Sequence, residues 1–334
     1  MEQINNKPAF TNLIDLAAEK IGGKTLACSD DFFAEKENLL KPGRGIFIAD
    51  KYTDRGKWMD GWESRRKRTP GNDWCILKLG ATGRLAGVNI DTNYFLGNHP
   101  PFASIDACYA GEDADLENLP WKEILVKSPL EPGSENFYEI EDDGMYNYLR
   151  LQIYPDGGVA RLKVFGEVVK DWSNVGEDET IDLAAAVNGA KSLGCNDMFF
   201  SHMDNLLMPG RGVNMGDGWE TKRNRTAGNQ DWVIVKLAHE GIIEKILIDT
   251  CHFKGNYPDA FRLEGTNIGD SNVDPTAGDY NSWITLVDDQ KLSADAEHTY
   301  EKEIAQKQPV THVRLLIKPD GGISRMRLWG KISK

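Results

Sequence analysis

The sequence predicts an all-β protein in which one β-sandwich occurs twice in tandem. Three sequence blocks recur in the same order along the 334 residues, which indicates a duplication. Between the blocks lie short runs of apolar and β-branched residues separated by turns that contain glycine, a pattern typical of antiparallel strands. The two copies span roughly residues 24–170 and 191–334, and each is long enough to bury its own core.

The repeated blocks define what the two copies share. They are an Asn-Leu-Leu segment that ends in Pro-Gly-Arg-Gly, a charged segment that begins with Asp-Gly-Trp-Glu, and an apolar segment interrupted by Pro-Asp-Gly-Gly. They cover residues 38–45, 60–72 and 150–166 in the first copy and residues 205–212, 217–229 and 314–330 in the second. A residue kept in both copies is expected to serve the shared scaffold or a shared site, whereas a residue present in one copy marks a difference in task.

A short helix is expected before the core of each copy. Residues 12–23 are rich in apolar residues and end in two glycines, and residues 180–194 show a similar pattern. The polar residues 171–179 between the copies are the best candidate for a linker. We therefore place the first domain at residues 1–172 and the second domain at residues 173–334.

Strands are predicted at residues 73–79 and 85–91, with a glycine-containing turn between them, and at the matching residues 231–237 and 243–249. The Asp-Gly pair inside each Pro-Asp-Gly-Gly segment predicts a hairpin, because glycine tolerates the positive φ that such turns need. Short strands at intervals of about 8–12 residues favour an antiparallel sandwich such as a jelly roll. The order of the strands does not follow from this pattern.

The composition excludes several classes of protein. The chain has 39 basic and 52 acidic residues, a net charge of −13, which disfavours non-specific binding to nucleic acid. No apolar run reaches the length of about 18 residues that a membrane span needs, and the N-terminal segment lacks the features of a signal peptide. Five cysteines, an odd number, argue against a disulfide framework and for a reducing cytoplasm. Cys28 and Cys195 occupy equivalent positions and are expected to be small buried apolar residues.

Recognisable motifs for metals and nucleotides are missing from the sequence. The six histidines are scattered, and neither His-x-His nor His-Glu-x-x-His occurs. There is no P-loop, no dinucleotide-binding glycine motif after a strand and no nucleophile elbow. We therefore predict no cofactor and no metal ligands, although a metal site assembled from residues distant in sequence would leave no such trace.

The repeated motifs resemble the allantoicase family. The resemblance rests on Asp-Gly-Trp-Glu and Arg-x-Arg-Thr in the charged block, on Asp-Thr-x-x-Phe-x-Gly-Asn at residues 91–98 and 249–256, and on the Pro-Asp-Gly-Gly block, and it covers nearly the whole chain. It implies two jelly-roll domains related to galactose-binding, discoidin-like modules. It also implies a homo-oligomeric hydrolase that converts allantoate to ureidoglycolate and urea in purine (allantoin) degradation.

Such a substrate sets clear requirements for its site. Allantoate carries one carboxylate and two neutral ureido groups on a single carbon. A planar guanidinium group pairs with both oxygens of a carboxylate, whereas carboxylates and amides accept hydrogen bonds from ureido N–H groups. Cleavage of the C–N bond needs a base to activate water and an acid to protonate the departing nitrogen.

Charged residues that occur in both copies are the first candidates for this site. Arg44 and Arg211 lie between glycines, which leave the backbone open to close approach by a ligand. The predicted catalytic carboxylates are Glu63 and Glu220. The predicted substrate-binding residues of this group are Arg44, Asp60, Arg66, Arg211, Asp217 and Arg223. The alternative is that these arginines and carboxylates pair with one another to fix loops.

The Asp-Thr-x-x-Phe-x-Gly-Asn motif is the best place to look for divergence between the copies. His252 stands in the second copy where the first copy has Tyr94, and histidine titrates near neutral pH. We predict that His252 is a catalytic acid or base, with an ordinary hydrogen-bonded histidine as the alternative. The first copy could use Tyr94 or His99 instead, or could be a degraded copy. Asn98 and Asn256 follow glycines and are predicted either to bind a ureido group or to form a turn.

The first copy also carries an insertion. Fourteen residues, 46–59, separate the Gly-Arg-Gly turn from Asp60, whereas four residues, 213–216, fill the matching gap in the second copy, so the first copy has ten more. The insertion is rich in charged and aromatic residues. It could form a lid over the site or a contact in an oligomer.

The competing function is a tandem binding protein for carbohydrates or small acids, without catalysis, since sandwiches of this kind often only bind sugars. The dense cluster of arginines and carboxylates suits a charged small acid better than a neutral sugar. We therefore expect an enzyme that acts on a small molecule in the cytoplasm, with no nucleic-acid or membrane partner.

Overall fold

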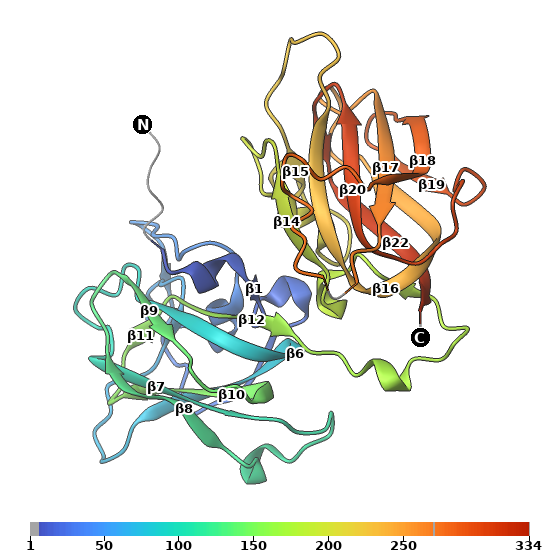
Figure 1. The fold of residues 1–334 in the computed structure, drawn as a ribbon. Helices are drawn as coiled ribbons and strands as arrows, with labels where there is room; N and C mark the ends of the chain where they lie inside the picture. The colour runs from blue at the N-terminus through green and yellow to red at the C-terminus, as the bar shows by residue number, and fades with distance from the viewer. Residues whose placement is uncertain (1–6, 270, 334) are drawn as a thin grey trace. The chain divides into compact units, whose positions relative to one another are not determined.

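The computed structural model describes residues 7–269 and 271–333. The chain divides into two compact units, Met1–Lys170 and Asp171–Lys334, which contain the first and the second copy. Each unit is an antiparallel β-sandwich, and the order of strands in the main sheet is the same in both (Figure 1). The predicted all-β class and the predicted tandem duplication are therefore confirmed.

The elements of the two units correspond in order. The strands of the first unit are β1 (Ile14–Asp15), β2 (Lys24–Cys28), β3 (Tyr52–Thr53), β4 (Gly56–Lys57), β5 (Trp62–Glu63), β6 (Asp73–Asp91), β7 (Phe102–Cys108), β8 (Lys122–Pro129), β9 (Glu135–Glu139), β10 (Met145–Tyr154), β11 (Gly158–Val159) and β12 (Arg161–Val168). Those of the second unit are β13 (Ile181–Asp182), β14 (Lys191–Cys195), β15 (Trp219–Glu220), β16 (Asp231–Asp249), β17 (Ala260–Thr266), β18 (Ile284–Lys291), β19 (Glu297–Tyr300), β20 (Val310–Lys318), β21 (Gly322–Ile323) and β22 (Arg325–Ile332). The 3-10 helices are η1 (Ala9–Asn12), η2 (Glu19–Ile21), η3 (Lys36–Leu40), η4 (Leu116–Asn118), η5 (Trp172–Asn174), η6 (Ala186–Asn188), η7 (Met203–Leu207) and η8 (Met215–Asp217).

One long strand contributes to both layers of each sandwich. The first half of β6, chiefly residues 73–78, pairs with β2 on one side and with β10 on the other. Its second half, chiefly residues 83–91, pairs with β9 and β12 instead. The pairing of β6 therefore changes at its middle, so that its two halves belong to different layers of the sandwich. The strand β16 has the same role in the second unit, between β20 and β22.

The turn predicted between residues 79 and 85 does not form, because β6 continues through it as a single strand. The glycines that suggested a turn allow close packing instead. A Cβ atom at Gly83 would lie 2.4 Å from Leu16 Cδ1, and one at Gly80 would lie 2.5 Å from the carbonyl oxygen of Ile21. Glycine inside a strand thus marks a close approach of neighbouring backbone. The matching strand β16 is also continuous.

The hairpin predicted around each Pro-Asp-Gly-Gly segment is also wrong. The strands before and after the segment, β10 and β12, lie on opposite sides of β6 and do not pair with each other. Between them, β11 pairs with β5, so that Gly158 stands opposite Glu63. In the second unit β21 pairs with β15 in the same way, with Gly322 opposite Glu220. The glycines therefore belong to a loop that returns to the charged block.

No regular α-helix forms where the two helices were predicted. Residues 12–23 contain the end of η1, the strand β1 and the single turn η2. Asp15 accepts hydrogen bonds from two backbone N–H groups, one of them in β12, and so holds the segment beside that strand. Asp182 makes the equivalent contacts in residues 180–194. These bonds satisfy the local backbone without a helix.

Trp62 and Trp219 are fully buried in the cores of the two units. Each indole N–H donates to a backbone carbonyl, that of Asp30 in the first unit and that of Asp197 in the second. A buried tryptophan needs such a partner for its one donor. These contacts fix the start of β5 and β15, from which the charged block continues.

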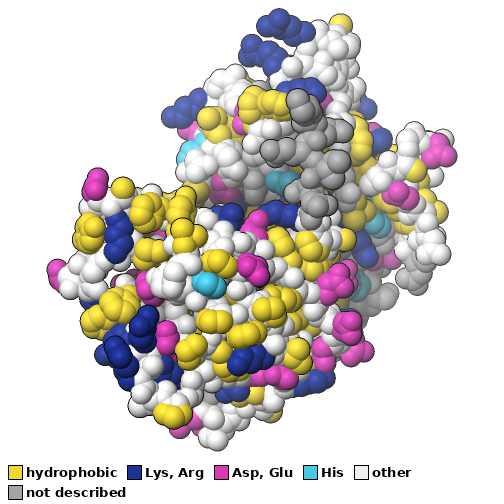
Figure 2. All heavy atoms as spheres, turned by 90° about the vertical axis from the view of Figure 1, so that its left-hand side faces the viewer, with side chains coloured by type: hydrophobic (Ala, Val, Ile, Leu, Met, Phe, Trp, Pro, Cys, Tyr) yellow, Lys and Arg dark blue, Asp and Glu magenta, His cyan; other side chains and the backbone are white. Residues whose placement is uncertain are grey.

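The five cysteines are free thiols. Cys28 and Cys195 are only partly buried, contrary to the prediction, because they lie on the short strands β2 and β14 next to β6 and β16. Among the described residues, no helix is long and apolar enough to cross a membrane. Figure 2 shows acidic and basic side chains interspersed over one face of the molecule.

Candidate active site

The pairing of β5 with β11 exposes one carboxylate of the charged block. Because neighbouring residues of a strand point to opposite sides, Trp62 faces the core while Glu63 faces outward. The pairing needs glycine at residue 158, since a Cβ atom there would lie 2.0 Å from the buried ring of Phe95. In the second unit, Glu220 follows Trp219 in the same way.

Each of these glutamates is bound by an asparagine of the Asp-Thr-x-x-Phe-x-Gly-Asn motif. Asn98 Nδ2 donates to Glu63 Oε1 at 2.8 Å, and Asn256 Nδ2 donates to Glu220 Oε1. Burial raises the pKa of both carboxyls above the ordinary glutamate value, and the hydrogen bond from asparagine opposes this rise. The structure thus brings together four predicted site residues as two equivalent pairs.

The pair in the second copy lies in a pocket of about 640 Å³, here called the Glu220 pocket. Arg223 and Arg225 line it together with Asn256 and Tyr257. Both arginines are exposed, and within residues 7–269 and 271–333 neither guanidinium group forms an ion pair. The pocket therefore combines a half-buried carboxylate, an amide and two available cations.

The pair in the first copy lies in a different setting. Glu63 and Asn98 line a pocket of about 380 Å³, here called the Glu63 pocket, with the insertion forming part of its wall. The insertion contains the small hairpin of β3 and β4, and its Phe47 stacks on Tyr94 with ring centroids 5.4 Å apart. Arg66 is exposed and does not line this pocket. The basic side chains that do line it, Arg55 and Lys57, come from the insertion.

The predicted substrate-binding residues Arg44 and Arg211 pair with protein carboxylates. Arg44 binds both oxygens of Asp91 at 2.7 Å each, and Arg211 binds both oxygens of Asp249 at 3.0 and 3.2 Å. The two aspartates are buried, and they raise the pKa of their arginines. Such forked pairs are strong and directional. Their predicted contact with substrate stays a prediction.

Asp60 and Asp217 form a second equivalent set of ion pairs. Asp60 Oδ2 lies 2.7 Å from Nη2 of Arg161, and Asp217 Oδ2 lies 2.8 Å from Nη2 of Arg325. The two arginines are almost fully buried. Asp60 also accepts a hydrogen bond from the backbone N–H of Ile46. These contacts agree with the alternative that arginines and carboxylates pair with one another to fix loops. The predicted contact of Asp60 and Asp217 with substrate stays a prediction.

His252 does not line the Glu220 pocket. Its backbone has φ 71°, which is uncommon for a residue with a side chain, and Tyr94 has φ 65° at the same place in the first copy. Its Nε2 is 2.8 Å from the carbonyl oxygen of Gly212. The predicted catalytic role of His252 stays a prediction.

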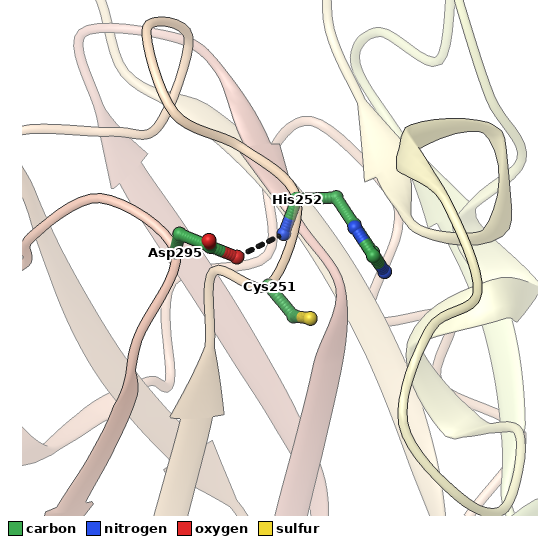
Figure 3. Close-up of side chains that lie close together, drawn as sticks. All are labelled: Cys251, His252 and Asp295. Atoms are coloured by element: carbon green, nitrogen blue, oxygen red, sulfur yellow. Dashed lines mark hydrogen bonds between the residues drawn. The ribbon is translucent and has the colours of Figure 1, made fainter.

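Around His252 the structure brings together residues that no sequence motif connects. Donor atoms of Cys251, His252 and Asp295 all lie within 4.8 Å of one another (Figure 3). The backbone N–H of His252 donates to Asp295 Oδ1 at 2.7 Å across 43 residues of sequence. No metal-binding spacing motif contains such a separation, so the sequence carries no signal of this cluster.

Tyr257 and Asp320 also line the Glu220 pocket and were not predicted as site residues, whereas Arg225 lies in the charged block that was predicted. Asp320 belongs to the repeated Pro-Asp-Gly-Gly segment, so it carried a signal. Asp320 Oδ2 accepts the backbone N–H of Asn224 at 2.8 Å and thereby holds the charged block. Tyr257 had no signal beyond its place after Asn256.

Comparison with known proteins finds relatives along both copies. The model of the allantoicase repeat matches residues 14–169 and 181–333. A probable allantoicase of Pseudomonas fluorescens (strain SBW25) is 47% identical over 325 residues, which cover 97% of this chain and 98% of that protein. Probable allantoicase 1 of Burkholderia mallei is 47% identical over 330 residues, 98% of each chain. The crystal structure of allantoicase from Saccharomyces cerevisiae is similar with a TM-score of 0.78 at 39% identity, and the match covers 95% of this chain and 92% of that one.

Proposed function

The chain belongs to the allantoicase family, and we propose that it hydrolyses allantoate to ureidoglycolate and urea in purine degradation. The family assignment rests on the repeat match in both copies and on relatives that are 47% identical over nearly their whole length. The reaction follows from the name that these relatives carry. The residues of this chain then supply a site that suits the substrate.

The Glu220 pocket is the observation that carries the proposal. It combines a carboxylate whose pKa is raised by burial with two guanidinium groups that are not engaged in ion pairs among the described residues. A raised pKa at a polar pocket is typical of a group that exchanges protons during a reaction. The two guanidinium groups offer the planar donors that the single carboxylate of allantoate needs.

Each group has a role that its chemistry permits. Arg223 and Arg225 bind the substrate carboxylate, because a guanidinium fork pairs with both of its oxygens. Asn256 uses its amide N–H for Glu220, which leaves its carbonyl oxygen to accept a ureido N–H. Asn256 therefore both orients the catalytic carboxylate and recognises the departing group.

Glu220 transfers the proton in the proposed mechanism. Its carboxylate accepts a proton from water while the water oxygen forms a bond to the central carbon of allantoate. The bond from that carbon to one ureido nitrogen breaks, and the nitrogen receives the proton from Glu220. Urea and ureidoglycolate leave, and Glu220 is again ionised.

We propose that the second copy carries this activity and that the first copy contributes little to turnover. The Glu63 pocket keeps the glutamate and the asparagine, but the insertion narrows it and replaces Arg66 by Arg55 and Lys57 as the lining cations. The shared pairs of Arg44 and Arg211 with aspartates support loops in both copies.

We propose further that the protein works in the cytoplasm as a homo-oligomer. The five free thiols support a reducing compartment. Exposed apolar side chains support self-association, since the Phe199 and Phe200 side chains of the second copy are 69% and 61% exposed. Size-exclusion chromatography with light scattering measures the oligomeric state directly.

Release of urea from allantoate by the purified protein tests the proposal. The expected result is one urea for each allantoate consumed, with ureidoglycolate as the second product identified by mass spectrometry. Heat-denatured protein is the control. Binding of allantoate without urea release would contradict the enzyme and favour a binding protein instead.

A further inference from the structure

We propose that Cys251, His252 and Asp295 form a binding site for one divalent transition-metal ion of the zinc type, present in the second copy only. The proposal goes beyond the hydrolysis of allantoate and does not rest on it. The site joins the loop that follows β16 to the loop that precedes β19 (Figure 3).

The donor set suits such an ion. A thiolate, an imidazole nitrogen and a carboxylate oxygen are the three ligand types that zinc takes from proteins. Ligand atoms about 2.0–2.3 Å from a tetrahedral ion stand roughly 3.3–3.8 Å apart. The three donors already lie within 4.8 Å of one another, so small side-chain rotations complete the geometry. The fourth position remains for water.

The imidazole of His252 is held in the tautomer that such a site needs. Its Nε2 lies 2.8 Å from the carbonyl oxygen of Gly212. A carbonyl only accepts hydrogen bonds, so Nε2 carries the proton and Nδ1 keeps the lone pair. A ring N–H bound to a backbone carbonyl is the usual second-shell support of a metal-binding histidine.

The surrounding charges are compatible with a bound cation. The guanidinium group of Arg211 is paired with Asp249 and also lies 3.3 Å from Glu297. Lys254 approaches Asp295 only to 3.9 Å and is 78% exposed, so a metal displaces it at little cost. A thiolate and a carboxylate together neutralise a divalent ion.

The first copy shows that the scaffold does not require these residues. Asn93 and Tyr94 replace Cys251 and His252 at the equivalent positions of its motif. The backbone is nevertheless alike, since Tyr94 has φ 65° and His252 has φ 71°. All three donors therefore appear together in one copy without a change in the chain path.

Asp295 is the most informative of the three replacements. The first copy has Gly133 at this position with φ 64°, and Asp295 adopts φ 52°. Glycine takes such a conformation without strain, whereas an aspartate pays a conformational cost. A ligand that binds the carboxylate offsets this cost. The hydrogen bond from the backbone N–H of His252 already supplies part of the compensation.

A bound ion would stiffen the loop that carries Asn256. His252 and Asn256 lie in the same motif between β16 and β17, and Asn256 holds Glu220. The ion would therefore act through the loop that carries Asn256 and not by contact with the substrate.

Titration of the chelator-treated full-length protein with Co²⁺ tests the site. Cobalt replaces zinc in such sites, and a cobalt–thiolate bond gives a charge-transfer absorption band. We expect this band to saturate at one Co²⁺ per chain. Absence of the band at saturating Co²⁺ would overturn the proposal.

The variants Cys251→Asn, His252→Tyr and Asp295→Gly install the residues of the first copy and so preserve the chain path. Each should weaken Co²⁺ binding by about 100-fold or more, since even second-shell partners are worth 10–100-fold. Cys251→Asn should also abolish the charge-transfer band. Cys195→Ala, which removes a partly buried thiol elsewhere, is the matched control and should keep it.

A band that persists in Cys251→Asn, or that disappears in Cys195→Ala, would overturn the assignment to this cluster. Circular dichroism of each metal-free variant verifies folding. Because the cobalt signal does not depend on turnover, a protein that binds cobalt without releasing urea would contradict the proposed function and leave the metal site standing.

Discussion

The two copies share a scaffold and differ in the loops that surround one glutamate. Both have the long bent strand, the buried tryptophan and the Glu–Asn pair. The first copy has ten more residues beside Glu63, and they line its pocket. The second copy leaves Glu220 in a larger pocket with two arginines. Duplication thus separates residues that maintain the fold from residues that serve a site.

The ion pairs illustrate this separation. Arg44 and Arg211 each bind a buried aspartate at the end of the long strand. Asp60 and Asp217 each bind a buried arginine that follows the Pro-Asp-Gly-Gly loop. Because both copies keep both pairs, while their pockets differ, we expect the pairs to support the scaffold.

The largest effect is expected from Glu220→Gln. The amide keeps the size of the side chain but cannot accept a proton from water, so kcat should fall by about 10²–10⁴-fold, the typical contribution of a general base. The measurement is the initial rate of urea release at saturating allantoate. Glu63→Gln is the matched control in the first copy and should change the rate less than threefold, roughly 0.6 kcal/mol on the barrier. An equal decrease in kcat in both variants would show that both copies contribute to turnover.

The shared ion pairs give the next largest effect, on stability. Asp60→Asn and Asp217→Asn each leave a buried arginine without its charge partner, which costs about 3–5 kcal/mol. Hydrogen exchange read by mass spectrometry reports on each copy separately. Each variant should lose protection in its own copy by a similar amount. Wild-type protection in either variant would mean that the pair does not support the scaffold.

A smaller effect is expected from removal of the two pocket arginines. Arg223→Met and Arg225→Met each remove a charged hydrogen bond to the substrate, worth about 1.5–3 kcal/mol, so KM for allantoate should rise about 10–100-fold with kcat less affected. Arg66→Met is the control in the first copy, because Arg66 does not line the Glu63 pocket. An unchanged KM in both second-copy variants would place the substrate carboxylate elsewhere.

The smallest effect is a shift in the pH profile. Burial raises the pKa of Glu220, and the hydrogen bond from Asn256 lowers it. In Asn256→Leu only the effect of burial remains, so the pKa of Glu220 rises further. Since Glu220 must be ionised to accept a proton, the acid limb of kcat/KM should move to higher pH. Asn98→Leu, its counterpart at Glu63, should leave the profile in place. A shift to lower pH in Asn256→Leu would contradict the assigned base.

The sequence predicted the duplication and the all-β class, because these depend on patterns that repeat along the chain. The predictions that rested on glycines were wrong. Gly80 and Gly83 suggested a turn, yet they allow the N-terminal segment to pack against a continuous strand. The glycines of Pro-Asp-Gly-Gly suggested a hairpin, yet β10 and β12 flank β6. A glycine in the sequence is compatible with a turn or with close packing of the backbone. Only the tertiary structure shows which of the two applies.

The sequence predicted several residues of the candidate site, but it did not predict which residues they contact. Glu220 and Asn256 were both candidates because both copies keep them, and the structure joins them. The repeat could not show that Arg211 forms an ion pair with Asp249, because both residues are present in both copies. Asp295 had no signal, because its neighbours in space lie 43 residues away in sequence.

A crystal structure of the Glu220→Gln variant with allantoate tests most directly whether the second copy is the working site. The substitution slows turnover while the pocket and its arginines remain. We expect allantoate in the Glu220 pocket, with its carboxylate on Arg223 and Arg225 and a ureido group at Asn256. Allantoate bound only beside Glu63, in the pocket lined by the insertion, would contradict it.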